Sequence, residues 1–381
     1  MKKPVEKNAG KNRKVQEWRR ERSLLFLYSP LLSFFLGILL AFLLSSLLIS
    51  WVGASPLLAF KALILGAFGS LNGFTETLVK ATPLMLTGLG LCVAFRSKVW
   101  NIGAEGQIHL GALATTLMGI YLPWFPSFIS LPLTGLAGFF AGGLWAAIPG
   151  WLKIRWGVNE IITTLMMNYI AILGINYAVH VPLKEPGGFL PQSALIQPSV
   201  ELPILVERTR LHAGILLGIA GAGALHILLA RTTLGYQIQV VGLNPDAGRY
   251  SGIPVGKIIL IAMVLSGGFA GLAGMGEIAG VHHRLLENFS PGYGYTAIVV
   301  ALLAHLKPLA VILVSMLFAA LIVGADTMQR VAGVPNSLVL IIESLIVLFV
   351  LGSRSLFHVR YPLLFVKDNE HKTTDGKLRI S

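Results

Sequence analysis

The sequence predicts an all-α protein that crosses a membrane many times. Of its 381 residues, 55% are apolar and 12% are charged, about half the charged share of a typical soluble domain. The mean hydropathy is +0.74. The apolar residues also run in long blocks, such as 31–52 and 337–351, and such blocks are typical of membrane-spanning helices.

The chain begins with a basic stretch, residues 1–28, which we expect to be a cytoplasmic tail. Its first 22 residues contain nine Lys and Arg and three Glu, and the apolar segment that follows ends near Trp51. A secretory signal has a shorter apolar core and a cleavage site of small residues. The first helix is therefore predicted to stay in the membrane.

Charges, prolines and glycines divide the apolar region 29–353, the predicted transmembrane domain, into about ten crossings. They are expected at 29–51, 79–96, 101–120, 130–150, 160–180, 212–230, 257–280, 292–306, 308–325 and 337–353. The piece 55–77 is apolar but interrupted by Lys61, three glycines and Asn72, which indicates an interfacial or re-entrant segment.

The distribution of basic residues predicts the orientation. With both ends in the cytoplasm, 23 of the 30 Lys and Arg, including those of the C-terminal tail 354–381, fall on the inner side, in agreement with the positive-inside rule. Ten crossings also divide into two groups of five, so an inverted repeat is possible. Glycine-broken spans around 103–106 and 292–294 favour it weakly.

Two long connections differ in character. The outer one, 181–211, has five prolines and no helical pattern, so we expect an ordered external loop. The inner one, 231–256, contains "NPD", which is a signal for a helix start: Asn244 as N-cap, Pro245 at the first helical position and Asp246 favourable to the helix dipole. A capped helix of about two turns could dock another protein, and a solvated connector is the alternative.

Four motifs resemble those of one family. "TTLGYQIQVVGLNPDAGRYSGI" resembles the cytoplasmic coupling loop of the permease subunits of ABC importers that serve simple sugars, branched-chain amino acids and nucleosides. "NIGAEGQ" and "VNEIITTLMMNYIA" resemble two further hallmarks, and "FSPGYGYTAIVVALLA" is most similar to the nucleoside branch. The resemblance covers roughly 77–351.

The resemblance implies a transport subunit of the bacterial cytoplasmic membrane, not an enzyme. It implies a partner ATPase that holds ATP and magnesium, a second permease chain, identical or related, and an external substrate-binding lipoprotein. The implied contacts with the ATPase are Asn244, Pro245, Asp246, Ala247, Gly248, Arg249, Tyr250 and Ser251. This chain is expected to bind no ATP itself, because no G-x-x-x-x-G-K-[ST] string occurs; the nearest, "GIPVGKI", has one spacer too few.

Polar residues inside spans should face a cavity or a partner, because they are costly in hydrocarbon. On a helix that includes Asn101, that residue, Glu105 and His109 share a face and Gln107 points elsewhere. The candidates for the substrate pathway are Asn101, Glu105, Gln107, Glu160, Asn168, Tyr293 and Tyr295. Their amide and hydroxyl groups suit a ribose or a base, whereas the alternative is that they hold helices together.

The predicted function is import of a nucleoside, of the purine class, by an ATP-driven permease. A simple sugar such as ribose or galactose is the second substrate class, and an ion-coupled secondary transporter using a buried carboxylate is a rival mechanism. The net charge of +13 is explained by topology and does not indicate nucleic acid. Cys92, the single cysteine, is expected to be a packing residue, and the adjacent His282 and His283 lack the partners of a metal site.

Overall fold

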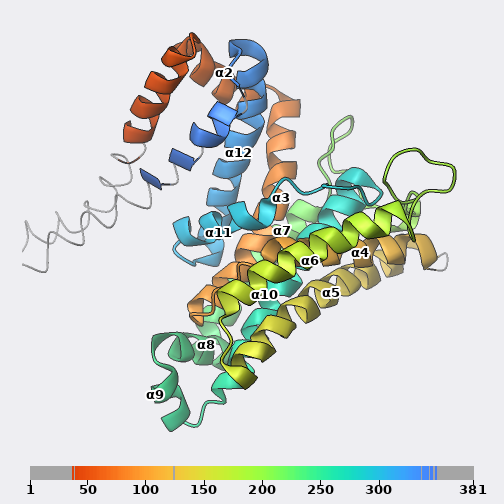
Figure 1. Ribbon diagram of the computed structural model, residues 1–381, viewed down its shortest axis with the longest axis vertical. Coiled ribbons are helices and arrows are strands. Elements are labelled where there is room, and N and C mark those ends of the chain that lie inside the picture. Colours follow the sequence, from red (N-terminus) through yellow and green to blue (C-terminus); the bar gives the residue numbers. More distant parts are fainter. Residues whose placement is uncertain are drawn as a thin grey trace, which may run out of the picture. The chain divides into compact units, whose positions relative to one another are not determined.

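Helices make up the regular structure of the residues that the computed structural model describes, which are 37, 39–122, 125–335, 337–342, 344–345 and 348–349 (Figure 1). These residues form isolated β-bridges but no β-strand. Six of their helices are long and apolar enough to cross a membrane, and a seventh candidate is obtained if Leu39–Trp51 and Pro56–Phe68 are counted together. An all-α protein with several spans is thereby confirmed, whereas the count of ten and the five-plus-five repeat stay predictions.

The chain divides into two units, and each is described by itself. The first consists of Met1–Ala59 with Gln329–Ser381 and includes the helix Leu39–Trp51. The predicted tails, 1–28 and 354–381, lie outside the described residues, as do parts of the first and last predicted crossings.

The second unit, Phe60–Met328, contains the residues predicted to be functional. Two helices, α2 and α12, extend beyond its limits. In chain order the helices are α2 (Pro56–Phe68), α3 (Leu71–Arg96), α4 (Ala104–Tyr121), α5 (Ser127–Trp156), α6 (Glu160–His180), η1 (Pro198–Val200), α7 (Gly214–Arg231), α8 (Thr233–Leu243), α9 (Pro245–Tyr250), α10 (Val255–Glu277), the π-helical turn η2 (Ile278–His282), α11 (Tyr293–Leu303) and α12 (Pro308–Ala332).

The predicted start of the second crossing, at residue 79, is wrong. Helix α3 begins at Leu71, where the Ser70 hydroxyl accepts a hydrogen bond from the Gly73 backbone N–H. The expectation of a separate segment rested on Lys61, three glycines and Asn72 in 55–77. In α3, the hydroxyls of Thr75 and Thr77 bond to the backbone carbonyls of Leu71 and Gly73 respectively. Because these hydroxyls form hydrogen bonds inside the helix, polar residues can continue it.

Two predicted crossings differ from ordinary spans. Helix α4 is a helix of 18 residues but is not among the six apolar candidates, because Glu105, Gln107 and His109 lie in its first two turns. Helix α11 has 11 residues, so it rises about 16 Å, roughly half the thickness of the hydrocarbon core. Both are helices that begin inside the protein core.

Glycines bring the central helices of the second unit into close contact. Helix α10 packs against α3, α4 and α5. A Cβ atom at Gly271 of α10 would overlap the carbonyl oxygen of Gly138 in α5, and one at Gly111 of α4 would overlap the backbone of Gly271. Backbones that approach each other this closely are typical of membrane helices with small residues at the interface. Cys92 is fully buried in α3, as a packing residue should be.

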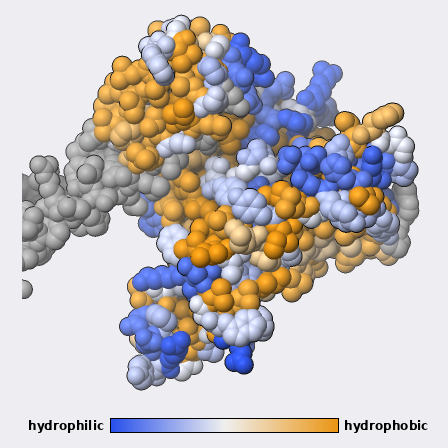
Figure 2. All heavy atoms as spheres, viewed as in Figure 1, coloured by the Kyte–Doolittle hydropathy of each residue, from blue (hydrophilic) through white to orange (hydrophobic). Residues whose placement is uncertain are grey.

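The second unit has two polar ends. At one end, Arg96 closes α3 and α8 packs on it, since a Cβ at Gly242 would overlap the Arg96 carbonyl oxygen. At the other end, the loop after α6 is ordered by backbone hydrogen bonds from Ile196 to His283 and from Leu202 to Ala279. Hydrophilic surface gathers over α8 and α9 and over that loop, with hydrophobic surface between them (Figure 2). This distribution is typical of a membrane protein.

Candidate functional site

The beginnings of α4 and α11 meet in the core of the second unit. The Glu105 carboxylate, 2% exposed, accepts a hydrogen bond of 2.7 Å from the backbone N–H of Gly294. A Cβ atom at Gly294 would overlap the backbone of Ala104 and Glu105, so only glycine permits this approach. A carboxylate at a helix N-terminus is stabilised by the helix dipole. Glu105 therefore holds α11 in place from the first turn of α4.

The Asn101 and Gln107 side chains form a reciprocal amide pair. Each amide donates to the other over 2.9 Å, and the Asn101 amide also donates to the Ser266 hydroxyl of α10. The expectation that Gln107 points away from Asn101 is wrong. Helix α4 begins only at Ala104, so Asn101 turns back over its start and accepts from the Gly103 N–H. Glu105 and His109 do share a face, with the His109 Nδ1 2.8 Å from the Glu105 carbonyl oxygen.

The buried polar residues of α6, Glu160, Thr164 and Asn168, form a polar stripe that hydrogen-bonds to the backbone leading into α4. The Asn168 side chain accepts from the Gly106 N–H at 2.8 Å and donates to the Ile102 carbonyl at 2.9 Å. The Thr164 hydroxyl accepts from the Ile102 N–H at 3.2 Å. Non-helical backbone in a membrane interior needs such partners, because no water is there to supply them. The stripe thus supports an irregular chain segment in the core.

Glu160 lies at the start of α6 and closes the same segment. Its carboxylate receives a hydrogen bond from the Trp100 N–H at 3.4 Å and an ion pair from the Lys153 ammonium of α5 at 2.6 Å. Asn159 caps α6, because its side chain accepts from the Ile161 N–H. Glu160 therefore joins the ends of α5 and α6 to the entrance of α4.

The two tyrosines of α11 have different surroundings. Tyr293 is 2% exposed, and its hydroxyl accepts a 2.9 Å hydrogen bond from the Lys80 ammonium of α3. Tyr295 is 38% exposed, and its hydroxyl accepts from the Asn168 amide at 3.2 Å. Of the two predicted pathway tyrosines, Tyr295 is the one with an exposed ring. Sequence analysis missed Lys80 as a member of this group, although a lysine within an apolar span was a signal.

A further polar group lies where α10 ends. The wider turn η2 returns His282 toward Glu277, with 3.5 Å between the imidazole Nε2 and the carboxylate. His282 and His109 both lie against the Phe289 ring, with 6.4 and 4.8 Å between ring centroids. In the described part of the chain, no group of three or more His, Cys, Asp or Glu has the arrangement of a metal site.

The predicted docking helix is present as α9. The Asn244 side chain accepts from the backbone N–H groups of Asp246 and Ala247, and Pro245 occupies the first turn. Gly252, with a φ of 76°, ends the segment as expected. Tyr250 of α9 is 94% exposed, and Arg249 and Asp246 form an exposed ion pair of 2.9 Å.

Helix α8, which precedes α9, was not expected. It is capped by Thr232, whose hydroxyl accepts from the Gly235 N–H, and the "TTLG" string carries that signal. Together α8 and α9 form an exposed helical pair at the end of the unit where α3 ends. Such a pair presents a preformed surface to another protein.

Comparison with known proteins gives one family and several relatives. Residues 73–351 match the family described as "Branched-chain amino acid transport system / permease component". A glucose ABC transporter permease protein, TsgB13, from Haloferax volcanii is 36% identical over 335 residues, covering 85% of this chain and 88% of that protein. A guanosine ABC transporter permease protein, NupP, from Bacillus subtilis is 36% identical over 328 residues, covering 85% of this chain and 92% of that protein.

A nucleoside ABC transporter permease protein, NupB, from Lactococcus lactis is 29% identical over 324 residues, covering 83% of this chain and 89% of that protein. No solved structure matches this chain.

Proposed function

Since the chain belongs to the family of branched-chain amino acid transport system permease components, and is thus the membrane subunit of an ABC importer for nucleosides or sugars, we propose that its substrate is a nucleoside of the purine class. The observation that carries this proposal is the similarity to a guanosine permease over 92% of that protein's length, together with the similarity to a second nucleoside permease. A simple sugar is the second candidate, because a glucose permease is similar to the same degree.

In this proposal, α9 receives the ATPase. Asn244, Pro245 and the dipole-matched Asp246 fix the start of the helix, while Arg249 and Tyr250 present side chains to the partner. A rigid, capped helix transmits a push better than a flexible loop. The push would reach α3 through the contact of Gly242 with the Arg96 carbonyl, and α10 through Val255, which lies beside Gly248.

ATP and magnesium belong to the ATPase in this scheme, and this chain binds neither. A second permease chain completes the pathway, and an external lipoprotein delivers the substrate. Both termini lie in the cytoplasm of a bacterial cell. The orientation is supported by the basic residues that close α3 and α5, which are Arg96, Lys153 and Arg155.

The pathway residues divide into two roles in this proposal. Tyr295, half-exposed and held by Asn168, offers a ring on which a base can stack. The buried Asn101, Gln107, Glu105 and Tyr293 shape the path, because their polar atoms already bond to neighbouring helices. Glu160 and Asn168 hold the irregular segment before α4.

Uptake of radiolabelled solutes tests the substrate. Cells that lack the transporter and cells that contain it with its ATPase and binding protein are offered guanosine, uridine, glucose and ribose in parallel. We expect guanosine uptake that survives a protonophore and stops when the ATPase is inactivated. Uptake of glucose or ribose but not guanosine would assign the sugar function instead, and uptake independent of the ATPase would contradict the import mechanism.

Charge reversal tests the docking helix. Arg249→Glu should abolish uptake while the protein still inserts and while the ATPase subunit still hydrolyses ATP. Arg155→Glu is the matched control, because Arg155 is also an exposed arginine, at the C-terminal end of α5 and outside Asn244–Ser251. Equal uptake by both variants would contradict the docking role of α9.

A further inference from the structure

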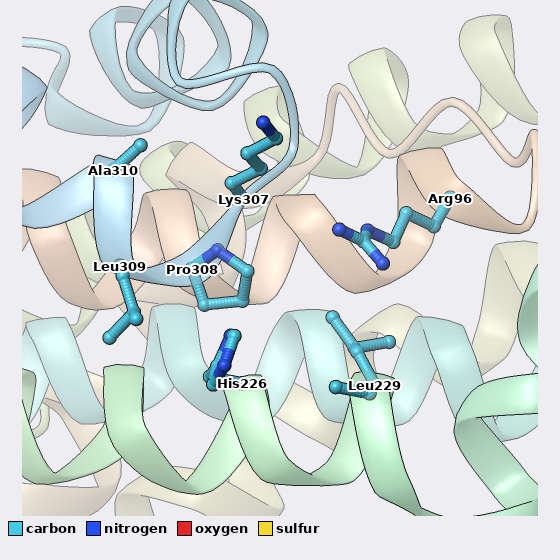
Figure 3. Close-up of a pocket in the computed structure, with 8 residues that line it drawn as sticks. Arg96, His226, Leu229, Lys307, Pro308, Leu309 and Ala310 are labelled. Atoms are coloured by element: carbon cyan, nitrogen blue, oxygen red, sulfur yellow. The ribbon is translucent and has the colours of Figure 1, made fainter.

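A cavity of about 500 Å³ opens between the ends of three helices, apart from the residues of the predicted pathway. Arg96 of α3, His226 and Leu229 of α7, and Lys307 with Pro308 before and in the first turn of α12 line it (Figure 3). Alanine and leucine side chains complete its wall. The cavity is large enough for a lipid headgroup and the beginning of an acyl chain.

Arg96 and Lys307 give this cavity its positive charge. In Figure 3, the Arg96 guanidinium and the His226 imidazole point toward Pro308 from opposite helices, and Lys307 extends from beside Pro308 with its ammonium directed away from His226. Among the lining residues that the structure describes, none is acidic. Cations gathered without a balancing carboxylate create a field that favours an anion.

The Arg96 guanidinium is held in position by the chain itself. Its Nε–H donates a 2.9 Å hydrogen bond to the Leu306 carbonyl oxygen in the linker between α11 and α12. That bond uses one of the five N–H donors of the guanidinium, so its planar fork retains donors for a phosphate. His305 and Leu306 in the linker both have a φ of 56°, which is uncommon for residues other than glycine. The linker is thus held in a costly conformation that turns the Leu306 carbonyl toward Arg96.

Exposed apolar side chains surround the cavity. On α7, Ile227 beside the cavity is 56% exposed, and on α12 Leu309 and Leu313 are 49% and 72% exposed. In a membrane protein, such leucines and isoleucines contact acyl chains. A molecule that satisfies both features has an anionic head and an apolar tail.

We propose that this cavity binds the phosphate of an anionic membrane phospholipid, such as phosphatidylglycerol, with Arg96 and Lys307 as the charged contacts. The exposed apolar side chains of α7 and α12 would contact its acyl chains. Basic pockets between membrane helices are known to select anionic headgroups. A soluble phosphate would satisfy the charges but would leave the apolar wall without a partner. A second copy of this chain, with a net charge of +13, is a poor source of negative charge.

The position of the cavity gives the lipid a mechanical role. The Arg96 carbonyl oxygen lies against Gly242 of α8, while the Arg96 side chain holds the linker before α12. A phosphate bound to Arg96 would therefore join α3, α7 and α12 next to the α8–α9 pair. This inference does not depend on which solute is transported.

Binding of a fluorescent phosphatidylglycerol to the purified full chain in detergent tests the proposal, with fluorescent phosphatidylcholine as the neutral probe. The double variant Arg96→Gln, Lys307→Gln should bind phosphatidylglycerol about 25-fold more weakly, because each cation near an anionic lipid contributes roughly a factor of five. Lys307→Gln alone, a change at an exposed side chain, should give about a fivefold loss. Arg231→Gln removes an exposed arginine from the end of α7 that does not line the cavity, and it should bind like the unmodified chain.

Several results would overturn the proposal. Equal phosphatidylglycerol affinity in the double variant and in Arg231→Gln would exclude Arg96 and Lys307 as the contacts. Displacement of the lipid by an excess of inorganic phosphate would identify a site for a free anion instead. An equal loss of phosphatidylcholine binding in the double variant would show that the change is not specific to the headgroup charge.

Discussion

Replacement of Gly271 by alanine tests the close packing of α10 most directly. Gly271 lies where α10 meets α5, and the added methyl group would overlap the Gly138 carbonyl oxygen and approach the Cα of Gly142. The obstacle is backbone and not a flexible side chain, so the helices themselves must move apart. No rotamer change can relieve the overlap.

The expected magnitude follows from two opposing effects. Overpacking of a close interface costs about 1–3 kcal/mol of the free energy of unfolding. Alanine in place of glycine in a helix returns up to about 1 kcal/mol through its higher helix propensity. Gly271→Ala should therefore destabilise the protein by a net amount of about 0–2 kcal/mol, and more if α4, which meets Gly271 through Gly111, is displaced as well.

Gly174→Ala is the matched control. Gly174 lies within α6, and a Cβ atom there would have no heavy atom within 4 Å. Only the propensity effect remains, so this variant should be slightly more stable than the unmodified chain. The measurement is the midpoint of thermal unfolding of the purified full chain in detergent. If Gly271→Ala were as stable as Gly174→Ala, the close contact of α10 with α5 would be refuted.

Three further changes address the network around α4. Glu105→Gln keeps an acceptor for the Gly294 N–H but removes the charge at the start of α11, so the free energy of unfolding should fall by about 0.3–2 kcal/mol; an unchanged unfolding midpoint would exclude a role for the charge. Asn168→Leu leaves the Gly106 N–H and the Ile102 carbonyl without their partner, and each unpaired group should lower the free energy of unfolding by about 1–3 kcal/mol. A total loss smaller than that of Glu105→Gln would contradict the support role of α6. Tyr295→Phe keeps the ring on which the base is proposed to stack, so the KM for uptake should stay unchanged; a higher KM would show that the hydroxyl, bonded to Asn168, is needed for solute binding.

The parts of the fold that follow from local chemistry could be predicted from the sequence. The cap at Asn244, the stop at Gly252 and the long apolar helices depend on neighbouring residues, and the structure confirms them. The start of α3 was misplaced because Asn72 and the glycines of 55–77 were interpreted as breaks, whereas Ser70 caps a helix that continues through Asn72 and Gly73.

The parts of the site that depend on distant residues could not be predicted. The sequence indicates that Glu105 and Asn168 need partners, but those partners, Gly294 and the Ile102–Gly106 backbone, are supplied by other helices. The pairing of Asn101 with Gln107 depended on where α4 begins, a position that helical periodicity does not fix. Lys80 was overlooked for the same reason, because its partner Tyr293 lies 213 positions away.

The bond between Glu105 and Gly294 also bears on how the chain is made. The two residues are 189 positions apart, so α4 leaves the ribosome long before α11 exists. During that interval the Glu105 carboxylate lacks its donor, and an ionised side chain is costly in lipid. We therefore expect nascent α4 to stay at the insertion machinery or at the membrane surface until α11 is made. Chains truncated before Gly292 should leave α4 accessible to water-borne labelling reagents, and full-length chains should protect it.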